Sequence, residues 1–385
     1  MKKKVFVVEC PGYDQTEEKI AQLLGMMGGI EQFVKPGQKI VLKPNLLAAA
    51  EPEKAVTTHP SVVAATARQV KKITGDILLV DSPGSGYSYD KKTLEKTYRV
   101  CEMDKAASAA GIRLNDDTTY ETVSYSDGKL VKRFEVLTPV AHCDGYINLC
   151  KFKTHALMYL TGAVKNIFGL IPGRIKPGYH STMPNNDLFA GVLLDLATMM
   201  PPVLTIMDAV VGMEGDGPFN GTPCQIGYLI ASTDLLAIDL LMSEMAGIPV
   251  ENNPLLTEAK KRGMYPASMD DVEVVGVPLE KLKLKEYKLP GSYSTHDHSS
   301  LGKGNLLMGL VKSGYTVEPR VKASACTACG ACKKACPRDA IQIINNVSVI
   351  DKTKCIRCYC CHEMCRYNAI ELHRSFLYRV ASRIG

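Results

Sequence analysis

Short hydrophobic runs alternate with amphipathic segments over about the first 280 of the 385 residues. Runs rich in β-branched residues are typical of strands, and apolar positions three and four residues apart are typical of helices. The pattern predicts strands at residues 4–8, 39–43, 77–81, 145–150, 203–208, 225–231 and 272–275. It predicts helices at residues 15–27, 59–73, 91–110, 187–199 and 235–246. This alternation indicates an α/β body with a mixed or mostly parallel sheet and flanking helices.

Composition divides the chain into four segments. Residues 1–282 form the α/β body, 283–318 a polar linker or loop, 319–373 a cysteine-rich domain and 374–385 a basic amphipathic tail. We interpret His296 and His298 in the linker as part of a polar loop rather than as a metal site. The tail has the pattern of a helix for a membrane surface or another subunit, but we expect it to pack on its own body.

Hydrophobic stretches in this chain are short. None reaches the roughly 18 uncharged apolar residues of a membrane-spanning helix, so we expect no transmembrane segment. The first residues are basic but hold too few apolar residues in a row for a secretory signal. We therefore expect a cytoplasmic protein, and a homodimer stays open.

Nine of the 14 cysteines fall between Cys326 and Cys365, at spacings typical of a metal centre. The order C-x2-C-x2-C-x3-C occurs at Cys326, Cys329, Cys332 and Cys336, and again at Cys355, Cys358, Cys361 and Cys365. Three thiolates on one tight loop reach three corners of an iron–sulfur cube, and the fourth points to the other cube. The repeat predicts two [4Fe-4S] clusters, the first bound by Cys326, Cys329, Cys332 and Cys365, the second by Cys355, Cys358, Cys361 and Cys336.

This repeat resembles the bacterial two-[4Fe-4S] ferredoxin fold, a small α+β domain, over about 55 residues. Matching hydrophobic segments at residues 340–344 and 369–372 supply the expected strands. Arg366 departs from the pattern, because a proline usually follows the fourth cysteine, as Pro337 does in the first repeat. Cys360 is an additional thiol without an assigned role. Two zinc sites are disfavoured. A zinc site requires four ligands but does not require a repeat of three close cysteines followed by a fourth.

The formal net charge of +6 is unevenly distributed. Residues 319–385 hold 12 Lys or Arg against 4 Asp or Glu, and the rest of the chain holds 34 against 36. Basic residues beside the cysteine loops are Lys333, Lys334, Arg338, Lys352, Lys354 and Arg357. A basic rim attracts acidic electron carriers, and ferredoxin or flavodoxin is the expected partner. The alternative, that these charges only offset the clusters or pair with the body, stays open; no nucleic-acid partner is expected.

Polar residues follow four of the predicted strands, at residues 43–45, 81–84, 151–155 and 208–218. In open α/β sheets, ligands bind beyond the carboxyl ends of strands. Lysines there bind anions and histidines transfer protons, so the candidate catalytic residues are Lys153, His155, Lys165 and His180. Candidate substrate-binding or cofactor-binding residues are Lys43, Asn45, Asp81, Asn166, Asp208 and Glu214. The alternatives are a solvated basic face and, for residues 212–218, a plain turn.

These motifs also resemble a known family. The matching residues are Lys43-Pro44-Asn45, Lys153-Thr154-His155, Lys165-Asn166 with Gly169, and Asp208 with Gly212, Glu214 and Gly217-Pro218. They resemble the family catalogued as domain of unknown function 362, whose members are described as uncharacterised iron–sulfur centre proteins, many with a C-terminal two-cluster ferredoxin module. The resemblance covers nearly the whole chain and implies this architecture and these site residues, but no reaction.

The leading functional hypothesis is an iron–sulfur oxidoreductase. Its two clusters relay electrons to or from a small anionic substrate or cofactor on the α/β body. The sequence has no flavin or nicotinamide signature, so any further organic cofactor is unidentified. One alternative is a non-catalytic electron carrier or maturation factor that docks a redox partner. The other is a hydrolase or transferase with structural clusters.

Overall fold

The centre of the body is a nine-stranded mixed sheet. The computed structural model of the chain describes residues 1–84, 86–183, 185–293 and 317–374. The strand order is β11-β1-β10-β9-β7-β2-β3-β4, and β8 pairs with β7. The strands are β1 (Lys3–Glu9), β2 (Ile40–Lys43), β3 (Ile77–Leu79), β4 (Arg113–Leu114), β7 (Gly145–His155), β8 (Tyr159–Thr161), β9 (Leu204–Glu214), β10 (Thr222–Ser232) and β11 (Val272–Gly276). Only β8 and β10 pair antiparallel with their neighbours, so the predicted mostly parallel α/β body is confirmed.

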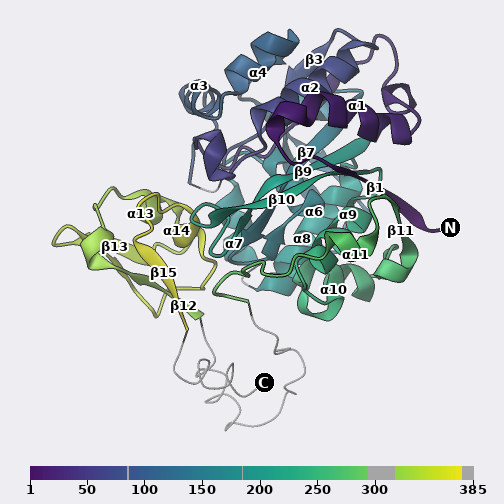
Figure 1. Cartoon of the computed structure of the whole chain (residues 1–385). Coiled ribbons are helices and arrows are strands. Elements are labelled where there is room, and N and C mark those ends of the chain that lie inside the picture. The colour runs from purple at the N-terminus through teal and green to yellow at the C-terminus, as the bar shows by residue number, and fades with distance from the viewer. Residues whose placement is uncertain (85, 184, 294–316, 375–385) are drawn as a thin grey trace.

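Helices cover both faces of this sheet (Figure 1). One face carries α1 (Thr16–Met26), α2 (Pro60–Lys71), α3 (Lys91–Val100) and α4 (Met103–Ala110), and the other carries α6 (Ala163–Ile167), α8 (Asn186–Met199), α9 (Leu235–Met245) and α10 (Pro254–Lys261). Strand β7 serves both layers, because Tyr146 and Cys150 pack on one side and Ile147 and Leu149 on the other. The remaining body elements are β5 (Tyr120–Ser124), β6 (Arg133–Leu137), α5 (Thr138–Ala141), α7 (Lys176–Thr182) and α11 (Leu279–Leu282).

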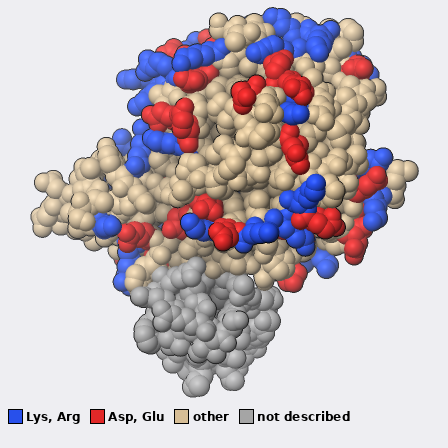
Figure 2. Space-filling model, viewed as in Figure 1, with Lys and Arg blue, Asp and Glu red and all other residues tan. Residues whose placement is uncertain are grey.

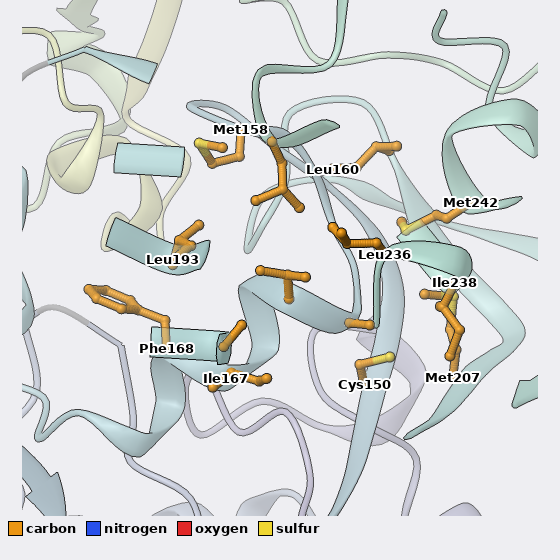
Figure 3. Packing of buried hydrophobic residues seen from close by; sticks show 14 of the residues in the cluster. Cys150, Met158, Leu160, Ile167, Phe168, Leu193, Met207, Leu236, Ile238 and Met242 are labelled. Carbon is orange, nitrogen blue, oxygen red and sulfur yellow. The ribbon is translucent and has the colours of Figure 1, made fainter. Parts of the chain in front are cut away.

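The core beneath α6 is densely apolar. Figure 3 shows Ile167, Phe168 and Leu193 beside Leu236 and other core residues. Burying one such side chain contributes about 1.5–3 kcal/mol, so this layer fixes the short helix α6 firmly. The polar residues on α6 therefore stand on a rigid support.

Two strands extend further than the sequence predicts. The strand expected at residues 145–150 continues to His155, and the one expected at 203–208 continues to Glu214. Lys151 and Asp208, taken as residues beyond strand ends, lie inside strands and are fully buried. The prediction was wrong there because their side chains neutralise one another, with 2.8 Å between Lys151 Nζ and Asp208 Oδ2.

The helix expected at residues 91–110 is two helices, α3 and α4. Glu102, between them, has a φ of 57°, a left-handed conformation that ends the helix. The hairpin of β5 and β6 and helix α10 were not predicted. Each of these elements is short, with five residues in β5 and in β6 and eight in α10.

The C-terminal module lies at one side of the body, with α14 toward it (Figure 1). Its elements are β12 (Val317–Val321), α13 (Ala331–Ala335), β13 (Ile341–Ile344), β14 (Val347–Ile350), α14 (Cys360–Glu363) and β15 (Ile370–Arg374). The two expected strands pair with different partners, because β13 pairs with β14 and β15 pairs with β12. The module is thus a small α+β unit made of two similar halves.

The predicted linker is described in part. Residues 283–293 lie on the body, where the Tyr287 hydroxyl donates to the Met213 carbonyl at 2.6 Å. The backbone N–H of Lys288 donates to Glu214 Oε2 at 3.0 Å. The segment with His296 and His298, and the tail after Arg374, lie outside the described residues. Among the described helices, none has the length and apolar character needed to cross a membrane.

Candidate functional site

A small cavity lies at the carboxyl ends of β2, β3 and β7. Its wall is formed by the loops after β2 and β3, the end of β7, α6 with the turn that follows it, α7, and one residue of α14. The cavity volume is about 50 Å³. One water requires roughly 10–15 Å³ of such volume, so the cavity has room for a few waters or a small ion.

Lys153 is the most deeply buried lysine of the lining, with 1% of its surface exposed. Its ammonium donates to Asn45 Oδ1 at 2.9 Å and to the Val56 carbonyl at 2.6 Å. Burial lowers the pKa of Lys153 well below its usual value, and the charges of Lys165 and Lys151 lower it further. The strand therefore holds this ammonium beside the cavity at a substantial electrostatic cost.

A chain of amides fixes the position of Asn45, the acceptor for Lys153. Asn45 Nδ2 donates to Asn166 Oδ1 at 2.8 Å, and Asn166 Nδ2 donates to Asn148 Oδ1 at 2.7 Å. Asn148 in turn donates to the Ala163 carbonyl at the start of α6. Because each amide is oriented by the next, the lysine and this wall of the cavity are held rigidly.

Lys43 and Asp81 form a buried ion pair behind the lining, with 2.8 Å between Lys43 Nζ and Asp81 Oδ1. Asp81 Oδ2 also accepts from the backbone N–H of Leu46 at 2.6 Å. Gly169 packs directly on the pair, and a Cβ there would lie 2.0 Å from Asp81 Oδ1. Only glycine allows this close approach. Asp81 lines the cavity, whereas Lys43 acts through Asp81.

His155 and His180 are both buried at the cavity. His155 Nδ1 accepts from the backbone N–H groups of Leu157 and Met158 at 3.0 and 3.2 Å, which leaves Nε2 facing Glu363. Burial lowers the pKa of His155 well below its usual value and that of His180 to about 3. Both rings are therefore neutral at pH 7.

Two further lysines complete the basic lining. Lys165 Nζ lies 5.1 Å from the centre of the Phe168 ring and 5.6 Å from that of Phe189, and it donates no hydrogen bond to the described residues. Lys176 donates to the carbonyls of Ser82 and Pro83 at 2.8 and 2.6 Å. Burial lowers the pKa of Lys176 to about 7. Lys165 is thus the ammonium best placed to meet a bound molecule.

Three polar atoms of the lining have no hydrogen-bond partner among the described residues: Thr161 Oγ1, His180 Nδ1 and Glu363 Oε1. Buried polar atoms are normally paired, so three at one cavity indicate a polar occupant. Burial raises the pKa of Glu363 to about 7, against the opposing effect of Lys165 and Lys153.

The cysteine loops of the module have the backbone expected of an iron–sulfur protein. Each half turns at positive φ in equivalent places, at Ala328 and Arg357, Gly330 and Tyr359, and Asp339 and Asn368. In each half the fourth cysteine sulfur accepts a backbone N–H at 3.2 Å, from Ala340 to Cys336 and from Ala369 to Cys365. Such N–H groups stabilise thiolates bound to iron. The residues present fit the clusters.

The cysteines of the two proposed ligand sets lie close together. Cys332 interacts electrostatically with Cys365 and Cys329, and Cys355 with Cys358 and Cys336. Cys361 interacts with Cys358, Cys355 and Cys336, and also with Cys332 of the other set. Within the described part of the chain, no three His, Cys, Asp or Glu side chains converge enough to hold a single ion.

The module meets the body at the cavity. Glu363 lies between Cys361 and Cys365 in the sequence and lines the cavity, with its Oε1 3.3 Å from His155 Nε2. Because the His155 ring is neutral, this is a close approach and not an ion pair, and Glu363 Oε1 has no hydrogen-bond partner among the described residues. Beside it, His362 Nε2 lies 3.3 Å from the Asp216 carbonyl, and Asn220 Nδ2 donates to the His362 carbonyl at 3.0 Å. One wall of the cavity is therefore part of the iron–sulfur module.

Comparison with known proteins agrees with both parts. Residues 40–244 match the model of the domain of unknown function 362 (DUF362), and residues 319–342 match a 4Fe-4S binding domain. The chain belongs to the DUF362 family. This confirms the family suggested by the sequence motifs, and the second match confirms an iron–sulfur binding module.

Relatives of this DUF362 protein include a thylakoid-associated protein of Synechocystis sp., 31% identical over 269 residues, which are 70% of this chain and 81% of that protein. A ferredoxin-like protein in the nif region of Sinorhizobium fredii is 46% identical over 39 residues, 10% of this chain and 61% of that protein. The lactate racemase apoprotein of Thermoanaerobacterium thermosaccharolyticum aligns with a TM-score of 0.38 and 12% identity, over 61% of this chain and 55% of that chain.

Most site residues predicted for this DUF362 protein lie at one cavity. Its lining includes the predicted residues Asn45, Asp81, Lys153, His155, Lys165, Asn166 and His180. Asp208 and Glu214 are not in the lining, so their role in binding stays a prediction. Asp208 belongs to a separate network with Lys151 and Tyr13, and Glu214 accepts from Lys288.

Sequence reasoning missed three residues of this DUF362 cavity that carry polar groups: Ser82, Thr161 and Glu363. Lys176 also lines the cavity and was not among the predicted site residues. Ser82 lies in the polar stretch at residues 81–84, whereas Thr161 lies outside the stretches that the sequence singled out. No sequence signal could identify Glu363, because its contact with His155 joins residues more than 200 positions apart.

Proposed function

We propose that this DUF362 protein is an iron–sulfur oxidoreductase in which two [4Fe-4S] clusters relay electrons to or from a small anionic molecule in the cavity. The observation that carries the proposal is the position of Glu363, which stands between two cluster ligands and also lines the cavity. A cluster held by Cys355, Cys358, Cys361 and Cys336 would therefore lie next to the bound molecule. Short separation favours electron transfer between them.

Charge and size support a small anion as the occupant. Lys153, Lys165 and Lys176 line the cavity, whereas the charge of Asp81 is taken up by Lys43. Burial lowers the pKa of each lysine, because the charged ammonium has lost contact with water. An anion in the cavity would offset this desolvation cost. The volume of about 50 Å³ suits a molecule of a few heavy atoms.

The lining residues have separate roles in this proposal. Lys165 contacts the anion, and Lys153 provides fixed positive charge beside it. Lys176, with its pKa lowered to about 7, supplies a proton near neutral pH. When bound, each cluster would supply or accept one electron, while the lining residues would bind the anion and Lys176 would supply a proton to it.

Electrons would enter at the first cluster, where the ligand Cys329 is exposed. Lys333, Lys334, Arg338 and Lys354 are also exposed on the module. On the face of the body seen in Figure 2, basic and acidic residues are interspersed. The exposed basic residues of the module support an acidic carrier such as ferredoxin or flavodoxin as its partner. A cytoplasmic location remains a prediction.

The cluster count is tested by anaerobic reconstitution. Eight iron and eight inorganic sulfide per chain are expected, because the repeat supplies eight cysteines, four for each of two cubes. Replacing Cys336 with Ser should deplete the cluster held by Cys355, Cys358 and Cys361. Loss of the other cluster alone would contradict the crossed ligand sets.

The redox role is tested by reducing the protein with dithionite and adding nitrite, sulfite or acetate. At least one anion should perturb the spectrum of a reduced cluster or speed its oxidation, and Lys165→Ala should weaken that effect about 100-fold. Lys96→Ala, which removes an exposed lysine of α3, is the matched control. If the wild type and Lys165→Ala respond alike, the cavity is no redox site, and a carrier that only docks a partner becomes the better account.

A further inference from the structure

The loop after β3 connects the cavity with the iron–sulfur module. Ser82 and Gly84 line the cavity, and Tyr87 follows in the same loop. Arg366 of the module donates to the Tyr87 hydroxyl from Nε at 3.2 Å and from Nη2 at 2.8 Å. Its guanidinium carbon also lies 5.5 Å from the centre of the Tyr87 ring. A single arginine thus binds both the edge and the face of one body residue.

Arg366 occupies an unusual position within the repeat. The second half of the module follows the first by 29 residues, as Cys336 and Cys365 show, and the residue equivalent to Arg366 is Pro337. The fourth cysteine of each half accepts the same N–H bond at 3.2 Å. The local sulfur geometry is therefore the same with proline or arginine next to the ligand. Cluster binding does not explain the arginine, whereas the contact with the body does.

Packing and charge around Tyr87 agree with a built contact. At Gly86 a Cβ would lie 2.8 Å from Met364 Cε and 3.2 Å from Ala335 Cβ, so the loop approaches both halves of the module closely. Tyr87 also packs against the cluster of buried residues that includes Cys358. The pKa of the exposed Glu51 lies below its usual value chiefly because of Lys54, and Arg366 adds to this effect.

We propose that Tyr87 and Arg366 form a latch that holds the second half of the module against the cavity. The latch keeps α14 in place, and with it Glu363 beside His155. Arg366 is a positioning residue, because it touches neither the cavity nor a cluster ligand among the described contacts. The contact itself is independent of the reaction. Its consequence, efficient electron delivery to the cavity, rests on the proposed function.

The test compares hydrogen–deuterium exchange of the full, anaerobically reconstituted protein with that of Arg366→Pro and Tyr87→Phe. Arg366→Pro installs the residue of the first half, and Tyr87→Phe removes only the hydroxyl. Both should keep wild-type iron and sulfide, while peptides covering α14 and the end of β7 exchange about fivefold faster, the loss expected for one such contact. The double variant should add little beyond either single change. Arg338→Ala, at an exposed arginine of the same module, is the control.

Unchanged exchange in both single variants, with full clusters, would overturn the latch. If Arg366→Pro binds less iron than the wild type, the exchange of Tyr87→Phe alone tests the latch, because this substitution alters no residue of the module. The two proposals fail separately. Faster exchange in a protein whose reduced clusters respond to none of the anions supports the latch and contradicts the proposed function.

Discussion

Lys151 and Lys153 lie two residues apart on β7, so their side chains leave the strand on the same face, and both are buried. Their surroundings differ. Lys151 Nζ lies 2.8 Å from Asp208 Oδ2 and donates to the Tyr13 hydroxyl. Lys153 Nζ donates only to neutral oxygens of Asn45 and Val56 among the described residues. A buried lysine that is paired with a carboxylate stabilises the fold. A buried lysine beside a cavity that has no carboxylate partner indicates that the cavity binds an anion.

The electrostatics of the two lysines differ in the same sense. Burial lowers the pKa of both ammonium groups. For Lys151 the charge of Asp208 raises the pKa and opposes burial. For Lys153 the largest effects after burial come from the charges of Lys165 and Lys151, and both lower the pKa further. An anion in the cavity would raise the pKa of Lys153 and stabilise its charged form, as Asp208 does for Lys151.

The largest expected effect separates the two lysines by stability. Lys151→Met leaves Asp208 buried without its partner, which should lower the free energy of unfolding by about 3–5 kcal/mol. Lys153→Met removes an ammonium that has only neutral partners, so we expect a change below about 1.5 kcal/mol together with loss of anion binding. Thermal denaturation of the reconstituted variants measures the difference.

A double substitution tests whether the stability lost in Lys151→Met comes from leaving Asp208 unpaired. Lys151→Met combined with Asp208→Leu should recover most of the lost stability, because a buried ion pair can be replaced by apolar residues at little cost. If Lys153→Met destabilises the protein as much as Lys151→Met, both lysines are architectural, and the contrast between them disappears.

Proton binding at Lys176 provides a second, smaller effect. Its pKa is lowered to about 7, from 10.5 as the ordinary value, so the unfolded chain binds one more proton between these limits. Stability should therefore rise with pH through this window, and Lys176→Met should remove that contribution. Binding of acetate, which favours the charged lysine, should weaken by up to about tenfold per pH unit above pH 7. Calorimetric titrations that give a flat profile would exclude Lys176 from the site.

The smallest expected effect concerns the surface of the module. Reduction of the clusters by an acidic ferredoxin should slow about tenfold as salt rises to about 0.5 M, because screening weakens attraction to the exposed lysines. Reversal of Lys333 and Lys334 to Glu should slow it at low salt. A rate indifferent to both changes would leave charge compensation of the clusters as the role of these residues.

The accuracy of the sequence predictions follows the range of the interactions involved. The iron–sulfur module could be predicted from cysteine spacing, because three of each four cysteines lie within one short loop and the loop geometry is local. The ends of β7 and β9 could not, because polar residues such as Lys151 and Asp208 suggest exposure until their pairing is known. The cavity was found in part because parallel strands end at one edge of the sheet. Glu363 was not, because only the docked module brings it there.

The most direct test of the central claim is the electron paramagnetic resonance spectrum of the dithionite-reduced protein with and without acetate. If the second cluster faces the cavity, acetate should alter the signal of the cluster held by Cys355, Cys358, Cys361 and Cys336, and Lys153→Met should abolish the change. The Cys336→Ser variant assigns the signal. A spectrum that acetate leaves unchanged, or in which only the first cluster responds, would contradict the claim that the second cluster and the lysine-lined cavity form one redox site.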